Sequence, residues 1–153
     1  MSFPDLNKPS HLLATFFGIG LLKPAPGTWG SLAAVLLWYF LDFLHSYAHS
    51  ILPAFILFSW LVCNKADQDS ESEDNSFIVI DEVAGMIVAL SFISDDLFLY
   101  LFAFLLFRLF DIFKPWPISW IDKNIKGCLG SILDDLISGF FTGGIIFAIF
   151  INI

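Results

Sequence analysis

The sequence predicts an all-α protein: a multi-pass helical membrane bundle with about five apolar helices, some of them short, preceded by an N-terminal interfacial segment. Hydrophobic residues make up 58% of the 153 residues and charged residues only 14%. The mean hydropathy of +0.81 is well above that of soluble globular chains. A membrane span needs roughly 20 mostly apolar residues. Uncharged runs that reach the usual range of about 17–25 residues lie at 24–41, 43–64 and 136–153, and shorter ones lie at 83–94 and 97–107.

Five apolar segments form the predicted bundle, and 1–153 is expected to be a single domain. Residues that break or cap helices bound these segments. Examples are the Pro/Gly turn at 23–27 and the Lys-Pro-Trp-Pro sequence at 114–117, because proline cannot continue the backbone hydrogen-bond ladder. The expected helices are 30–44, 51–64, 80–94, 97–112 and 131–153.

The connecting segments also have predicted forms. Residues 12–22 are too short to span, so we expect an interfacial or re-entrant piece there. The polar residues 45–50 predict a turn, and 115–130 an amphipathic surface loop. The β-branched residues 77–80 resemble a strand, but a lone strand in lipid leaves its backbone unpaired, so a helix start is expected. The acidic, Ser-rich residues 67–76 predict a solvated, flexible loop rather than a metal site.

All seven positively charged residues fall on one side of this predicted topology. They are Lys8, Lys23, Lys65, Arg108, Lys114, Lys123 and Lys126. Because cations concentrate on the cytoplasmic side of membrane proteins, we expect this face to be cytoplasmic. His45 and His49 lie on the opposite side, which favours a turn or interface role. The net charge of −8 and the lack of a basic patch argue against nucleic-acid binding.

Two acidic pairs, Asp81-Glu82 and Asp134-Asp135, predict a metal site. Carboxylates are costly in a membrane helix, so they usually face inward and serve a function. They offer only oxygen ligands, which select hard cations such as Mg²⁺. The alternative is simple helix N-terminal charge, since both pairs are expected in first turns.

Small residues predict how these acids meet. Glycine and alanine at every fourth position permit close helix contact. We expect two such stripes to face each other and bring the acidic pairs together: Asp135, Gly139 and Gly143 on one helix, and Glu82, Gly85 and Ala89 on the other.

The remaining candidates suit a phosphate group. Arg108 and Asp111 share a helix face, either as a simple ion pair or with Arg108 free to hold phosphate oxygens, and Lys114 adds a second cation. Thr28 and Ser31 open a helix whose free N–H groups suit an anion, or one of them is a plain N-cap.

The two cysteines, Cys63 and Cys128, form neither a zinc pattern nor a disulfide framework, so small-residue packing is expected.

In order along 11–145, four motifs resemble the phosphatidylglycerophosphatase A family. They are Pro26-Gly27-Thr28 with Gly30-Ser31; Ile80-Asp81-Glu82 with Gly85; Arg108, Asp111, Lys114-Pro115-Trp116-Pro117 and Asp122; and Gly127, Gly130 and Asp134-Asp135. One departure is Cys128, where the family commonly has glycine. The resemblance implies an all-helical, Mg²⁺-dependent phosphatase of the bacterial inner membrane that converts phosphatidylglycerophosphate to phosphatidylglycerol.

In the expected mechanism Asp81, Glu82, Asp134 and Asp135 hold one or two Mg²⁺ ions. Arg108 and Lys114 neutralise the phosphoryl oxygens. Asp111 orients Arg108, binds metal or acts as base. Attack by water is favoured over a covalent aspartyl-phosphate.

Two other classes remain open. An ion-coupled transporter predicts acids near mid-bilayer and an internal repeat, and a non-catalytic lipid-headgroup-binding protein tolerates loss of the acids. The sequence predicts no oligomeric state.

Overall fold

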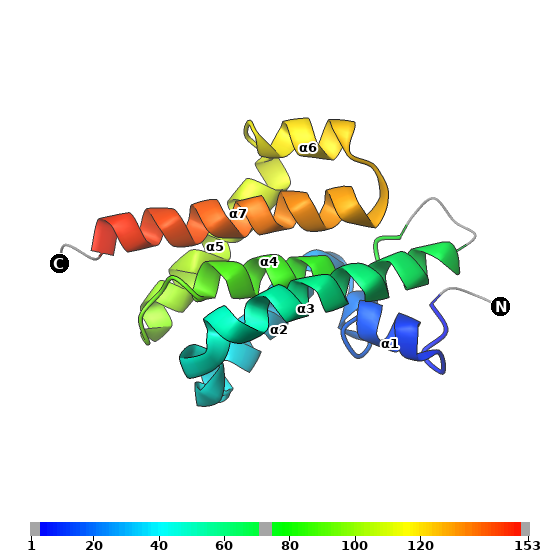
Figure 1. The fold of residues 1–153 in the computed structure, drawn as a ribbon, viewed down its shortest axis with the longest axis horizontal. Coiled ribbons are helices and arrows are strands. Elements are labelled where there is room, and N and C mark those ends of the chain that lie inside the picture. The colour runs from blue at the N-terminus through cyan, green and yellow to red at the C-terminus, as the bar shows by residue number, and fades with distance from the viewer. Residues whose placement is uncertain (1–3, 71–74, 151–153) are drawn as a thin grey trace.

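A computed structural model describes residues 4–70 and 75–150, except for the side chains of 42–44, and every regular element in those ranges is helical (Figure 1). The all-α prediction is therefore confirmed for the described part of the chain. The elements are α1 (Pro9–Ala14), the 3₁₀ turn η1 (Ile19–Leu21), α2 (Pro26–Phe40), α3 (Asp42–Gln68), α4 (Ile80–Leu90), α5 (Leu97–Phe113), α6 (Ile118–Asn124) and α7 (Gly127–Phe150).

The short helix α4 is the centre of the bundle. It packs against α7 most extensively and also contacts α2, α3 and α5. Every residue of α4 is buried except Glu82, which is half-buried. In Figure 1, α4 and α7 run side by side in the same direction, with α3 along the other side of α4.

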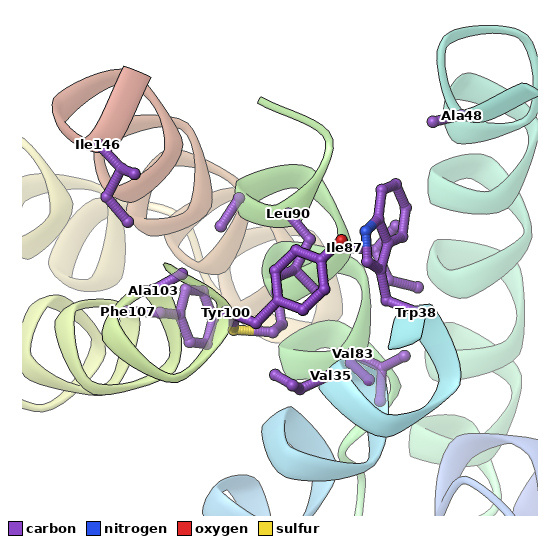
Figure 2. Close-up of a cluster of buried hydrophobic side chains, with 13 residues drawn as sticks. Val35, Trp38, Ala48, Val83, Ile87, Leu90, Tyr100, Ala103, Phe107 and Ile146 are labelled. Atoms are coloured by element: carbon purple, nitrogen blue, oxygen red, sulfur yellow. The ribbon is translucent and has the colours of Figure 1, made fainter. Parts of the chain in front are cut away.

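Two apolar clusters flank α4. The larger joins α2, α4 and α5, and Figure 2 shows Trp38, Leu90 and Tyr100 converging in it. The smaller joins α1, α3 and α7 around Ile80 and Ile132. Burying one large apolar side chain stabilises a fold by about 1.5–3 kcal/mol, so these clusters fix α4 from both sides.

The later helices agree with the expected segments, with shifted ends. The helix expected at 80–94 stops at Leu90, and that expected at 97–112 is α5. Lys114 ends α5 in the left-handed conformation, with φ of 44°. No strand forms at 77–80, where α4 begins at Ile80. The expected surface loop at 115–130 instead contains α6 and the start of α7.

The predicted turn at 45–50 is wrong. The chain reverses at Leu41, and α3 continues through these residues as one helix with Pro53 inside it. Of the polar side chains that suggested a turn, Ser46, His49 and Ser50 are exposed on this helix, and the ring of His45 pairs with Asp95 and with the carbonyl oxygen of Trp38.

The predicted N-caps are also wrong. Ala25 is the N-cap of α2 and Pro26 is its first residue, because a fixed φ and a missing N–H suit that position. Thr28 and Ser31 therefore lie inside the helix, where the Ser31 hydroxyl donates to the Gly27 carbonyl at 2.8 Å.

Among the described residues, two helical segments are long and apolar enough to cross a membrane: His45–Gln68 and Gly127–Phe150. The expectation of about five apolar spans is thus met only in part, since α2, α4 and α5 have 15, 11 and 17 residues. The N-terminal segment is short, as expected, and Phe17 within it is exposed. Within the predicted flexible loop, residues 67 and 68 belong to α3, and 71–74 lie outside the described residues.

Candidate active site

The site is built where α4 and α7 touch through glycine. A Cβ placed on Gly85 would lie 2.5 Å from the carbonyl oxygen of Asp135, and one on Gly139 would lie 2.1 Å from that of Gly85. One turn further on, a Cβ on Gly143 would lie 2.8 Å from the carbonyl oxygen of Ala89. The prediction that the two stripes face each other is confirmed. Backbone contact this close leaves the adjacent acids no freedom to separate.

Three carboxylates meet at this contact. Oxygen atoms of Asp81, Glu82 and Asp135 all lie within 4.8 Å of one another. Asp81 and Asp135 are buried, with 5% and 3% of their surface exposed. Asp81 is held in place at both oxygens, because one accepts from the backbone N–H of Glu82 at 3.2 Å and the other accepts from the hydroxyl of Ser131.

This cluster fits a hard cation. Oxygen Oε2 of Glu82 and Oδ1 of Asp135 are buried and have no hydrogen-bond partner among the described residues. Buried unpaired oxygens of this kind are costly unless something else satisfies them. An all-oxygen ligand set of three carboxylates suits Mg²⁺ rather than a soft metal.

Asp134 faces a different partner. Its carboxylate accepts from Nζ of Lys114 at 2.7 Å, and the same ammonium donates to Asp122 of α6 at 2.6 Å. The structure therefore places Asp134 in an ion-paired group beside the three-carboxylate cluster. The expectation that both acidic pairs occupy first turns holds for Asp81 and Glu82 only, because α7 begins at Gly127 and Asp134 lies two turns inside it.

Charge pairing shapes the titration of this group. Burial lowers the pKa of the Lys114 ammonium, but its hydrogen bonds to Asp122 and Asp134 outweigh this and leave the pKa above its usual range. The same hydrogen bond from Lys114 holds the pKa of Asp122 below its usual range. Both directions favour the charged forms, so Lys114 and Asp122 form a cation–anion pair at neutral pH.

Arg108 occupies the other flank. Its guanidinium pairs with Asp111 at 2.6 Å and donates to the hydroxyl of Ser31 at 3.4 Å. Both Glu82 and Arg108 crowd Gly27, where a Cβ would meet them at 2.2 and 3.2 Å. The predicted ion pair is therefore present, and Arg108 lies beside Glu82 of the acidic cluster.

A cavity of about 500 Å³ opens onto the cluster. Its lining includes Gly27, Asp81, Glu82, Arg108 and Ser131, but not Thr28. Of the two candidate phosphate-binding residues in α2, only Ser31 contacts a residue of the site, because its hydroxyl accepts a hydrogen bond from Arg108. The predicted residues that the structure gathers here are thus mostly the acids and the arginine.

The structure corrects the prediction for the cysteines. Cys63 of α3 and Cys128 of α7 form a disulfide at the wall of this cavity. They are 65 residues apart, and the smaller apolar cluster between α3 and α7 brings them together. Ser131 was also not predicted, although it stands one helical turn before Asp135 and so points to the same face.

An all-oxygen acidic cluster flanked by a guanidinium and an ammonium, set in an apolar helical bundle, has the chemistry of a site that binds a hard cation and a phosphate group. Residues 12–150 match the family model described as Phosphatidylglycerophosphatase A, and the chain belongs to that family. It is therefore a phosphatase hydrolase.

Curated relatives agree with this assignment. Phosphatidylglycerophosphatase A of Escherichia coli K12 is 37% identical over 94% of this chain and 85% of its own length. The protein of the same name from Haemophilus influenzae is 37% identical over 95% of this chain and 91% of its own. A relative from Bacteroides thetaiotaomicron, named a candidate phosphatidylinositol-3-phosphatase, is 32% identical over 90% of this chain and 92% of its own length. No solved structure matches the chain.

Proposed function

We propose that this protein hydrolyses phosphatidylglycerophosphate to phosphatidylglycerol and phosphate with the help of Mg²⁺. The observation that carries the proposal is the three-carboxylate cluster of Asp81, Glu82 and Asp135 beside Arg108. Both relatives named phosphatidylglycerophosphatase A support the substrate. A phosphomonoester dianion needs such a cationic flank, while the acids alone would repel it.

Each side chain has a role that follows from its position. Asp81, Glu82 and Asp135 hold the magnesium, which when bound supplies charge screening and Lewis-acid activation at the phosphoryl group. Arg108, oriented by its 2.6 Å pair with Asp111, binds phosphoryl oxygens and neutralises charge that grows on them. Lys114 provides a second, more distant cation. Asp134 is tied to Lys114 and supports the site from that side.

The site is proposed to face the cytoplasm in a multi-pass arrangement. Arg108 and Lys114 belong to the site itself, and Lys123 and Lys126 follow on or just after α6, whereas the far end near Asp95 and Asp96 carries acids. Trp116 and Trp120 are 80% and 54% exposed on the site side. Amphipathic indoles and cations at one end suit the headgroup region of the cytoplasmic leaflet.

The test is phosphate release from phosphatidylglycerophosphate by the purified protein, with Mg²⁺ and with a chelator. The variants Asp81→Asn and Asp135→Asn are expected to lose about 100-fold or more in rate while remaining folded. Asp96→Asn, a carboxylate that caps α5 at the far end, serves as the matched control. Mg²⁺ should also raise the unfolding temperature of the wild type, and this shift should disappear in Asp135→Asn.

The possible outcomes separate the rival classes. Full activity in the Asp81 and Asp135 variants contradicts the metal assignment. An inactive wild type that still binds anionic lipid indicates a headgroup-binding protein, and one that moves ions across vesicles indicates a transporter. Phosphatidylinositol-3-phosphate should be assayed in parallel, because the Bacteroides relative carries that name.

A further inference from the structure

We propose that Asp122 is a positioning residue that sets the place of Lys114 at the edge of the active site. This inference rests on the proposed function. It starts from a contact between two elements: Asp122 is in α6, Lys114 ends α5, and their charged groups are 2.6 Å apart. The third member, Asp134 of α7, lies 2.7 Å from the same ammonium.

Lys114 needs such anchoring because of where it stands. It follows the last residue of α5, has a φ of 44° and is itself followed by Pro115. A lysine side chain has four rotatable bonds and loses up to about 2 kcal/mol of entropy when it is fixed. Without partners, an ammonium at a helix end samples many positions. Two carboxylates from separate helices reduce these to one.

The two carboxylates are not equivalent. Asp134 is buried at 4% side-chain exposure and belongs to the rigid α7 contact, so it holds the ammonium near the acidic cluster. Asp122 is half-exposed at 46% and approaches from the solvent side. Its helix is fixed because Ile118 and Ile121 are buried and α6 packs on α7. Asp122 therefore keeps the ammonium from turning outward, while the Lys114 side chain stays 30% exposed.

The geometry predicts a particular pattern of coupling. If Asp122 acts through Lys114, removing its charge should cost about tenfold in kcat/KM, as small misplacements of a catalytic group do. The same change should cost little when Lys114 has already been replaced, because residues that share one function are not additive. A merely structural role would produce the same loss in both backgrounds.

The experiment uses the purified full chain with phosphatidylglycerophosphate and Mg²⁺. Asp122→Asn is expected to lower kcat/KM about tenfold, and Asp122→Glu to restore most of it. Lys114→Gln and the double variant Asp122→Asn with Lys114→Gln are measured with enzyme in excess over substrate, so that slow turnover is visible. They are expected to have similar rates. Asp96→Asn is the matched carboxylate control.

Each outcome decides the question. Wild-type rates in Asp122→Asn, an equal loss on both Lys114 backgrounds, or a failure of Asp122→Glu to recover activity would overturn the inference. The unfolding temperature of each variant separates misfolding from mispositioning, and a loss in Asp122→Asn that is matched by unfolding would also count against it. A wild type with no phosphatase activity refutes the proposed function instead.

Discussion

Substituting one glycine in the α4–α7 contact should disable the site without touching any charged group. In Gly85→Ala the new Cβ would meet the carbonyl oxygen of Asp135 at 2.5 Å, while ordinary contact begins at 3.4 Å. The two helices must therefore separate by about 0.9 Å locally. Metal ligands tolerate deviations of about 0.2 Å, and a misplacement of about 1 Å can cost 100-fold in rate.

The expected result is a loss of about 100-fold in phosphate release and about 1–3 kcal/mol in stability from overpacking. Gly144→Ala is the matched control, because it makes the same change in α7 where nothing lies within 4 Å of the new Cβ. Phosphate release and thermal unfolding are measured for both. A Gly85→Ala enzyme with wild-type activity and Mg²⁺ response would refute the claim that backbone contact sets the distances between the acids.

Further predictions concern the walls of the site. Arg108→Lys should reduce activity about tenfold or more, because an ammonium cannot keep both the 2.6 Å pair with Asp111 and a forked contact to phosphate; equal rates would contradict this. Reduction of the Cys63–Cys128 bond should lower the free energy of unfolding by about 4 kcal/mol, from the entropy of a loop spanning 65 residues. Cys63→Ser should behave like the reduced protein and retain activity, since neither sulfur belongs to the acidic cluster; unchanged unfolding on reduction would show that the bond constrains little. Chelation should lower the unfolding temperature of wild type but not that of Asp135→Asn.

Local spacing predicted the helix contact well. Glycines four residues apart mark a face on which a backbone can approach, and acids on the same stripes necessarily approach with them. The start of α7 was missed because Gly127 and Gly130 resemble a loop. Gly130 in fact serves close packing, since a Cβ there would lie 1.9 Å from the carbonyl oxygen of Ile125. That earlier start moves Asp134 and Asp135 from the first turn to the interior of the helix.

Contacts between residues far apart in the sequence could not be predicted from such patterns. The pairing of Lys114 with both Asp122 and Asp134 depends on how α6 folds back onto α7. The Cys63–Cys128 bond depends on α3 meeting α7, which no spacing in the sequence encodes. The polar residues at 45–50 suggested a turn, but His45 has its partner Asp95 in another part of the chain, which spacing cannot show.

The enclosure of α4 has a consequence for the enzyme in its native surroundings. An 11-residue helix rises only about 16 Å, roughly half of a hydrocarbon core of about 30 Å. Its residues are buried except for the half-buried Glu82, so in the proposed multi-pass arrangement the surrounding helices separate the segment that carries Asp81 and Glu82 from lipid tails. Changes in acyl-chain length would then strain the outer helices first. The spacing of the acids should stay the same in thin and thick bilayers alike.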